Sequence, residues 1–233
     1  MIHAASSLPA MQGPVISFTF DDVPRSAISV GADILGKHGL QGTYYVCMGL
    51  AHTINAAGEH FGPDDLGWLA ANGHEIGCHT FGHLSLRDHS AEDIAADLDR
   101  NHLALQQVLP GFTPRQFAYP YGHIGIETWR LVKTRFETCR GTLSGIHSLR
   151  ERCDRLFANS LYETVPVAKN LRLIDQVLGK GGWLIFYTHD IATSPSSFGC
   201  TPHYFEAVVS KAAASGAEVL KIGEAAKRLR AIE

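Results

Sequence analysis

Two adjacent aspartates, Asp21 and Asp22, follow the apolar stretch Val15–Phe20 and precede Pro24. The apolar stretch predicts a buried strand, and the proline predicts that this strand ends there. Neighbouring side chains of a regular strand point to opposite faces, so both acids can share a site only where the backbone turns. One carboxylate could then bind a cation, and the other could accept a proton from a water molecule. The alternative is a strand end with two solvated acids.

Two histidines, His79 and His83, are separated by three residues, which on a helical turn would bring both imidazoles to one face. Together with Asp22 they form a set of three ligands that leaves positions open for water and substrate, as in catalytic metal sites. The chain contains 13 histidines, so a chance pair on a solvated loop is the alternative. Cys78 precedes His79 on a predicted strand and should face the opposite side, in the core.

The segment Arg115–Gly122, "RQFAYPYG", predicts a strand followed by a tight turn. Arg115 could hold the carboxylate of Asp21 through two parallel hydrogen bonds. Pro120 and Gly122 could aim the backbone N–H of Tyr121 into the site, where it would stabilise an oxyanion. The alternative is an ordinary strand-to-loop turn with a surface arginine.

A further histidine, His189, follows the apolar stretch Trp183–Thr188. A histidine at the end of a buried strand suits a general acid that protonates a leaving amine. The alternative is a structural histidine bonded to Asp190 or to the backbone. His147 and His123 also fall near predicted loop mouths, where they would contact substrate or be incidental.

These residues follow predicted strands in a chain where strands and amphipathic helices alternate. The expected strands are Val15–Phe20, Thr43–Cys47, His74–Cys78, Gln116–Tyr119, Glu137–Cys139, Trp183–Thr188 and Glu218–Ile222. The expected helices are Ala27–Lys37, Asp64–Ala71, Ala91–Leu109, Glu127–Lys133, Ala168–Leu178, Tyr204–Ala214 and Gly223–Ala231. Such alternation predicts a mostly parallel α/β sheet, either a barrel or an open doubly wound sheet. Active sites of α/β barrels lie at the carboxyl ends of the strands, where these polar residues fall.

The composition indicates one folded domain over residues 1–233, with 45% apolar and 18% charged residues. The net charge of −3, without a basic block, argues against a nucleic acid partner. No apolar stretch approaches the roughly 20 residues of a transmembrane helix, and the first residues do not resemble a signal peptide. We therefore expect a cytoplasmic protein. The five cysteines lack a CxxC pair, which predicts reduced thiols.

Four motifs together resemble the polysaccharide deacetylases, the carbohydrate esterase family 4 or NodB homology group. The motifs are "TFDD", "HTFGH", "RQFAYPYG" and "LIFYTHD", which lie within residues 15–190 in the family's order. The resemblance implies a distorted (β/α)7 barrel, TIM-like and of the NodB type. It also implies a metal-dependent hydrolase that removes an N-acyl group, usually acetyl, from an amino sugar.

The resemblance also implies roles for individual residues. Asp21 would be the catalytic base, His189 the acid, and Arg115 the arginine that braces the base. The metal ligands would be Asp22, His79 and His83, holding zinc, with cobalt or nickel as further possibilities. The backbone N–H of Tyr121 would help to hold the oxyanion, and Leu184 would line the pocket for the acyl methyl group.

The chain departs from the family at the fourth motif, an Asp-Asp-Trp signature whose acid partners the catalytic histidine. The corresponding segment, residues 136–147, reads "FETCRGTLSGIH". What orients His189 is therefore open. We expect a small cytosolic substrate, an N-acylated amino sugar that is nucleotide-linked or lipid-linked.

Three alternatives remain open from the sequence. The chain could be a deformylase, or a metal-independent cyclic-amide hydrolase like the allantoinases of the same superfamily. It could also be a non-catalytic barrel that binds a sugar or a metal. The complete set of metal ligands favours the metal-dependent hydrolase. The oligomeric state is not predictable from this chain.

Overall fold

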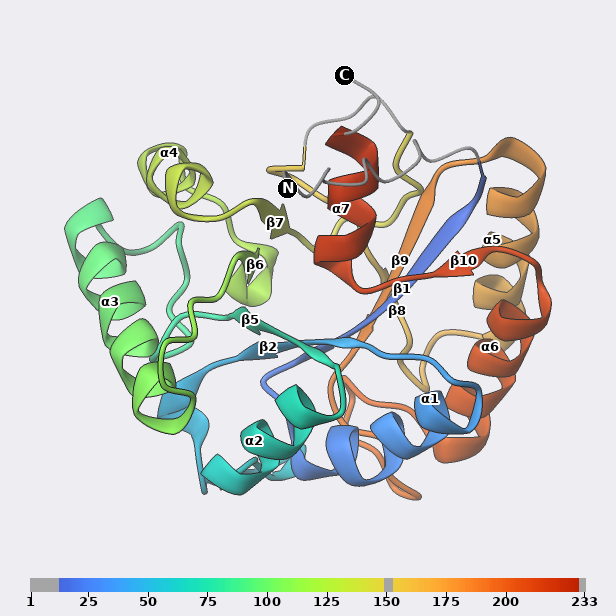
Figure 1. The fold of residues 1–233 in the computed structure, drawn as a ribbon, viewed down its shortest axis with the longest axis horizontal. Coiled ribbons are helices and arrows are strands. Elements are labelled where there is room, and N and C mark those ends of the chain that lie inside the picture. The colour runs from blue at the N-terminus through green and yellow to red at the C-terminus, as the bar shows by residue number, and fades with distance from the viewer. Residues whose placement is uncertain (1–12, 149–152, 231–233) are drawn as a thin grey trace, which may run out of the picture.

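A parallel sheet forms the centre of the computed structural model, which describes residues 13–148 and 153–230. Its strands follow the order β7-β6-β5-β2-β1-β9-β8, and β10 pairs with β1 (Figure 1). The strands are β1 (Val15–Asp21), β2 (Thr43–Val46), β5 (Glu75–Cys78), β6 (Gln116–Ala118), β7 (Thr138–Arg140), β8 (Asn159–Ser160), β9 (Trp183–Thr188) and β10 (Glu218–Val219). All seven predicted strands are present. The sequence analysis missed β8, which is only two residues long.

The sheet curls into an incomplete barrel, which confirms the predicted barrel class. Beyond β7, the segment that begins at Cys153 continues the hydrogen bonding. The Cys139 N–H donates to the carbonyl of Cys153, and the Gly141 N–H to that of Leu156, over 2.8 and 2.9 Å. A separate small hairpin, β3 (Ile54–Asn55) with β4 (Gly58–Glu59), follows β2 and was not predicted.

Helices pack on both sides of the sheet: the last of them packs against its inner face, and the others cover its outside (Figure 1). They are α1 (Asp33–Lys37), α2 (Pro63–Ala71), α3 (Ala91–Val108), α4 (Ile126–Arg135), α5 (Val167–Lys180), α6 (Pro202–Ala214) and α7 (Ile222–Arg230), and a wider π-helical turn (Ala27–Ala32) precedes α1. Side-chain caps begin two of them. Ser90 Oγ accepts from the Asp93 N–H over 3.1 Å at the start of α3, and Thr201 Oγ1 caps α6 in the same way.

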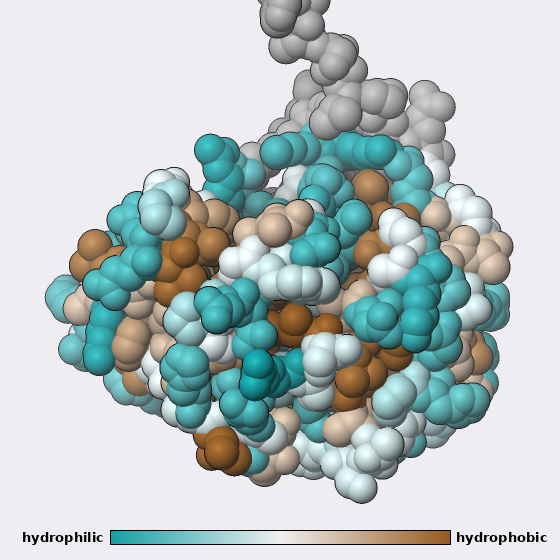
Figure 2. Space-filling model, turned by 60° about the horizontal axis from the view of Figure 1, so that its bottom comes forward, coloured by the Kyte–Doolittle hydropathy of each residue, from teal (hydrophilic) through white to brown (hydrophobic). Residues whose placement is uncertain are grey.

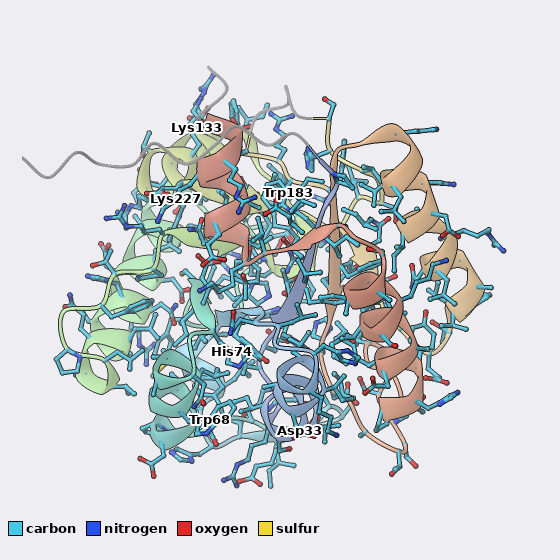
Figure 3. The ribbon with its side chains drawn as sticks, turned by 45° about the vertical axis from the view of Figure 1, so that its right-hand side comes forward. Asp33, Trp68, His74, Lys133, Trp183 and Lys227 are labelled. Atoms are coloured by element: carbon cyan, nitrogen blue, oxygen red, sulfur yellow. The ribbon has the colours of Figure 1, made fainter. Side chains whose placement is uncertain are left out.

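The central strands are apolar on both faces because both faces are buried. On the outer face, Phe18 stacks on Phe186 with ring centroids 5.7 Å apart, in the core beneath the helices. The inner face carries Val15, Ile185 and the fully buried Trp183, in a second core that α7 completes with small apolar side chains. Figure 3 shows Trp183 beside α7 at this end of the sheet, well apart from Trp68 and His74. The helix α7 therefore lies at the end where β1 begins.

The surface is mixed in character. On the face shown in Figure 2, hydrophilic side chains predominate, and hydrophobic side chains are exposed at separate points and in recesses between them. Within the described parts of the chain, no helix combines the length and the apolar character needed to cross a membrane. No disulfide joins the five cysteines.

Candidate active site

Polar side chains from several strands meet at the carboxyl edge of the sheet. Asp21 and Asp22 come from the end of β1, His79 and His83 from the loop after β5, and His189 from the end of β9. All five line a cavity of about 570 Å³. Its other lining residues include Asn55, Ala56 and Ala57 of the β3–β4 hairpin, four tyrosines, and the segment Ser196–Phe198. The predicted gathering of these residues at one edge is confirmed.

The two adjacent acids share this cavity because the backbone turns sharply after Asp21. Asp22 and Val23 have φ angles of 59° and 56°, in the left-handed region, and the Val23 N–H donates to the Asp21 carbonyl over 2.6 Å. This conformation is costly for a β-branched residue such as Val23. Tertiary packing holds it, since the Val23 side chain is buried in the outer core. The turn places both carboxylates on one side of the chain.

Three potential ligand atoms lie together on one side of the cavity. Oδ1 of Asp22 lies 3.3 Å from Nε2 of His83 and 3.6 Å from Nε2 of His79. This oxygen is buried and has no hydrogen-bond partner among the described residues. A buried carboxylate oxygen without a donor suits a bound cation, so the three residues fit a divalent metal.

The surroundings of the two histidines favour neutral imidazoles that can bind a metal. Nδ1 of His79 lies 2.8 Å from the carbonyl oxygen of Ala118, so it carries the proton and leaves Nε2 available as a ligand. Burial lowers the pKa of His79 to about 3 and also lowers the pKa of His83, so both imidazoles are neutral near pH 7. Burial raises the pKa of Asp22 to about 6, and the charge of Asp21 adds to this effect. A cation would oppose that increase.

Polar side chains of α3 hold the loop that carries the histidines. Oδ1 of Asp97 accepts from the Phe81 N–H over 2.6 Å, and Oδ2 accepts from the Gly82 N–H over 3.1 Å. Thr80 and His83 have positive φ angles of 65° and 52°, so this loop needs such support. The sequence analysis missed Asp97. The one feature of the sequence that could have indicated Asp97 is its position on the helix that follows the His79–His83 motif.

Asp21 is buried and paired with a buried arginine, Arg140 at the end of β7, whose Nη2 donates to its Oδ1. Burial alone would raise the pKa of Asp21, but the charge of Arg140 and its hydrogen bond to the carboxylate oppose this and hold the pKa below its ordinary value. The guanidinium lies between the rings of Tyr45 and Tyr187, at 5.1 and 5.0 Å from their centroids. Asp21 is therefore a carboxylate near pH 7.

The expected contact between Arg115 and Asp21 is wrong. Arg115 precedes β6, and its side chain is 69% exposed and bonded to Glu137 over 2.7 Å. In the sheet, Ala118 lies opposite Arg140 on the neighbouring strand. The arginine that reaches Asp21 therefore comes from the next strand along the chain, at the carboxyl edge, whereas Arg115 lies at the amino end of its own strand.

Tyr121 lies in the predicted tight turn. Its φ is 59°, and the Gly122 N–H donates to the Tyr119 carbonyl over 2.9 Å. The ring lines the cavity and lies edge-on to the ring of His83, with centroids 4.4 Å apart. The turn therefore brings the Tyr121 peptide to the same side of the cavity as the ligand set.

His189 adjoins Asp22 in the cavity, with Nε2 at 3.9 Å from Oδ2 of Asp22. Its Nδ1 lies 3.2 Å from the carbonyl oxygen of Phe198, to which it donates. The carboxylate of Asp190 is not its partner, because Asp190 accepts from the N–H of Ser196 over 2.8 Å and from the Ser196 hydroxyl. A backbone carbonyl therefore orients His189.

Comparison with known proteins places this arrangement in a family. A family model described as polysaccharide deacetylase matches residues 9–135, more than half of the chain. The chain belongs to the polysaccharide deacetylase family. It is 25% identical to a chitin deacetylase from Colletotrichum lindemuthianum over 139 residues, which cover 56% of this chain and 54% of that protein. The chain thus spans about half the length of this curated relative.

Solved structures with low sequence identity share the fold of this polysaccharide deacetylase family member. A family 4 acetyl xylan esterase from Clostridium thermocellum, in complex with a cobalt ion, is 18% identical, with a TM-score of 0.62 and coverage of 90% of this chain and 89% of that one. A peptidoglycan deacetylase from Bacillus subtilis is 19% identical, with a TM-score of 0.61 and coverage of 94% of both chains. These likenesses support the barrel architecture.

Two residues expected in the pocket of this family member lie elsewhere. Leu184 is buried in the outer core, and Tyr187 lines the cavity from β9 instead. The two residues are an odd number of positions apart on one strand, so they face opposite sides of the sheet. His147 lies near the start of β9, where it pairs with Trp183 and lines a different cavity, of about 640 Å³.

His123 also lies outside the lining of the active-site cavity, with Nδ1 at 2.9 Å from the Ser85 hydroxyl. Cys78 faces the core between the sheet and α3, as expected. There its sulfur accepts a hydrogen bond from Asn101 over 3.3 Å. The cysteine next to His79 therefore points away from the ligand set.

Proposed function

We propose that this chain is a metal-dependent hydrolase that removes an N-acyl group, most often acetyl, from an amino sugar. The observation that supports this most strongly is the ionised, buried Asp21 beside the three potential metal ligands. His189 lines the same cavity, next to Asp22. A base, a metal site and an acid around one cavity suit amide hydrolysis by an activated water molecule.

Asp22, His79 and His83 would hold the metal. A bound divalent ion would act as a Lewis acid towards the acyl oxygen and would lower the pKa of its bound water towards ~7. Two imidazole nitrogens and one carboxylate oxygen suit zinc, and they also accept cobalt or nickel.

The remaining steps use this chain's own groups. Asp21 would accept a proton from the attacking water, with its other oxygen held by Arg140. The backbone N–H of Tyr121 would stabilise the oxyanion of the tetrahedral intermediate. His189 would give a proton from Nε2 to the leaving amine, while its Nδ1–H stays bonded to the Phe198 carbonyl.

The substrate would be a sugar conjugate built inside the cell, either nucleotide-linked or lipid-linked. A reducing compartment is supported by the five cysteines, none joined by a disulfide and four of them buried. Relatives act on chitin, xylan or peptidoglycan according to their names, so polymeric chitin is the main competing substrate.

The decisive experiment combines metal content with acetate release. We expect about one zinc-like ion per chain by mass spectrometry, and its loss in the double variant His79→Ala/His83→Ala. N-acetylated amino sugars and N-formyl analogues would be assayed with the wild-type chain and with Asp21→Asn. The Asp21→Asn variant should keep the metal but lose most turnover, because only the proton acceptor is removed.

Other results would overturn the proposal. Near-normal turnover by Asp21→Asn would remove Asp21 as the base. A protein that binds no metal even after reconstitution would redirect the search to metal-independent cyclic amides. A bound metal with no acyl release from any substrate would indicate a non-catalytic barrel.

A further inference from the structure

A buried acid, Asp190, directly follows His189 at the end of β9. Its two carboxylate oxygens accept hydrogen bonds from a single loop residue, Ser196. Oδ2 accepts from the Ser196 N–H over 2.8 Å, and Oδ1 accepts from the Ser196 hydroxyl over 2.5 Å. Burying a carboxylate is costly, and here the cost is offset by hydrogen bonds that order the loop after β9. The loop that Asp190 orders is the one that reaches His189.

Hydrogen bonds lead from Asp190 to His189 through this loop, whose segment Ser196–Phe198 lines the cavity. The Ser196 hydroxyl donates to Asp190 and accepts from the Phe198 N–H over 3.1 Å. The Phe198 carbonyl accepts from Nδ1 of His189 and from the His189 N–H, both over 3.2 Å. The carbonyl that orients the imidazole therefore belongs to a residue whose N–H is held by a serine that Asp190 fixes.

The loop also packs tightly on Asp190. A Cβ at Gly199 would collide with Oδ1 and with the carbonyl oxygen of Asp190, so only a glycine allows this close approach. The Cys200 N–H closes the base of the loop by donating to the same Asp190 carbonyl over 3.1 Å. Asp190 therefore contacts the loop with its side chain and with its backbone, directly beside the peptide that carries the Phe198 carbonyl.

The direction in which Nε2 of His189 points depends on the bond at Nδ1. Nε2 lies 3.9 Å from Oδ2 of Asp22, beside the potential metal ligands. With its Nδ1–H on the Phe198 carbonyl, the neutral ring is held in one tautomer and one orientation. In many enzymes a carboxylate binds the second nitrogen of such a histidine directly. Here a serine and a peptide stand between the carboxylate and the imidazole.

We propose that Asp190 is a positioning residue for His189, which holds Ser196 and through it the Phe198 carbonyl, so that Nε2 of the imidazole points at the leaving group. The inference rests on the proposed function, in which His189 protonates the leaving amine. Asp190 acts through hydrogen bonds that an amide side chain can also make. It serves the step in which the amine leaves, and not the attack of water.

The nature of the leaving group separates this role from a general loss of structure. N-acetylglucosamine releases an amine that must be protonated, whereas 4-nitrophenyl acetate releases a stable anion that needs no proton. In the zinc-loaded protein, Asp190→Ala should lower kcat for the amide by about 10–100-fold with KM unchanged. Hydrolysis of the ester should stay within about twofold of wild type, because no acid is needed. Equal losses on both substrates would overturn the proposal.

Two further variants serve as controls. Asp190→Asn can accept the Ser196 N–H at Oδ1 and donate to the Ser196 hydroxyl from Nδ2, so it should restore amide hydrolysis close to the wild-type rate. Glu163→Ala removes a carboxylate that accepts from the Thr201 N–H over 2.8 Å, at the end of the same loop but outside the cavity lining. It should leave both rates unchanged. Equal loss in Asp190→Asn and Asp190→Ala would refute positioning by hydrogen bonds.

A double variant tests whether Asp190 acts through His189. His189→Ala should lower amide hydrolysis by about 100–10,000-fold, as the loss of a general acid does. Asp190→Ala/His189→Ala should lose no more, because residues that act as a unit are not additive. Losses that multiply would refute the proposal. If Asp190→Ala does not fold, Ser196→Ala replaces it, since that variant loses only the hydroxyl that holds the Phe198 N–H.

The tautomer of His189 tests the inference without turnover. Long-range ¹⁵N NMR of the zinc-loaded protein, with the His189 signals assigned by their absence in His189→Ala, reports which nitrogen carries the proton of the neutral ring. We expect Nδ1 in the wild type and in Asp190→Asn, and a substantial share on Nε2 in Asp190→Ala. The same tautomer in all three would refute the positioning role. A tautomer change without acetate release from any N-acetylated amino sugar would uphold that role and refute the deacetylase.

Discussion

Arg140 donates a hydrogen bond to Asp21 across the interior of the barrel, although the two residues are 119 positions apart in the sequence. Both side chains are buried, so each offsets part of the cost of burying the other's charge. The pair keeps the pKa of Asp21 low in spite of burial, which is what a base that must be ionised near pH 7 requires.

Replacing Arg140 with methionine should impair both stability and turnover. The change leaves the Asp21 carboxylate buried without its partner, so the free energy of unfolding should fall by about 3–5 kcal/mol. Acetate release should fall by about 100-fold, because the base is no longer held in position. Urea denaturation and an acetate assay measure the two effects.

Arg115→Met is the matched control, since it removes the arginine that the sequence favoured. Arg115 forms an exposed ion pair with Glu137, which contributes only ~0–1 kcal/mol, so stability and turnover should stay close to wild type. If Arg140→Met does not fold, Asp21→Asn/Arg140→Met should recover part of the stability. A loss of turnover in Arg115→Met and not in Arg140→Met would contradict the assignment.

Asp97→Ala should weaken metal binding although Asp97 does not face the metal site. Without this carboxylate, the N–H groups of Phe81 and Gly82 lose their acceptor and the histidine loop loses its support. We expect metal affinity to fall by about 10–100-fold, as for other groups that orient ligands. Competition with a chelating dye measures it. Asp175→Ala, which breaks a surface pair with Lys211, should have wild-type affinity; equal loss in both variants would count against the prediction.

Gly122→Ala should disturb the active site more than Gly111→Ala. Both glycines have positive φ angles, 68° and 77°, so alanine costs about 1–2 kcal/mol at either position. Only at Gly122 would the new Cβ collide with Thr142, which lines the cavity, whereas Gly111 has open space around it. Thermal unfolding and acetate release should therefore both be worse for Gly122→Ala. Equal thermal stability and equal acetate release in the two variants would contradict this prediction, because Thr142 would then move aside at no cost.

His74 should make stability depend on pH below neutrality. Burial and the charge of Lys221 lower the pKa of His74 to about 4 in the folded protein, against ~6.5 in the unfolded chain. Between these values the unfolded chain binds more protons, so the free energy of unfolding falls as the pH falls, by up to about 1.4 kcal/mol per pH unit. Urea denaturation from pH 7 to pH 4.5 measures this slope.

His74→Asn provides the control for that slope. Nδ1 of His74 accepts from the Gly42 N–H over 3.1 Å, and an asparagine Oδ1 can take the same hydrogen bond without titrating. The ring packs beside Trp68, as Figure 3 shows, so a small uniform loss of stability is expected. The slope should be shallower than in wild type; equal slopes would mean that His74 does not titrate as proposed.

The order and type of the main helices and strands could be predicted from the amino-acid pattern. Alternating apolar stretches and amphipathic helices predicted the strands of the parallel sheet, because burial on both faces requires apolar side chains in such strands. It also predicted which histidines and acids share one edge, since the carboxyl ends of parallel strands meet there. The common location of Asp22, His79 and His83 could be predicted because each follows a predicted strand.

Contacts between distant parts of the chain set which arginine reaches Asp21 and what orients His189. Arg140 and Ala118 are neighbours through sheet register, which pairing across β6 and β7 sets and local sequence does not. The Phe198 carbonyl binds His189 because a loop folds back over the end of β9, and a backbone acceptor leaves no signature in the sequence. Leu184 and Tyr187 differ for a related reason: which face of a strand lines the cavity depends on how the sheet curls.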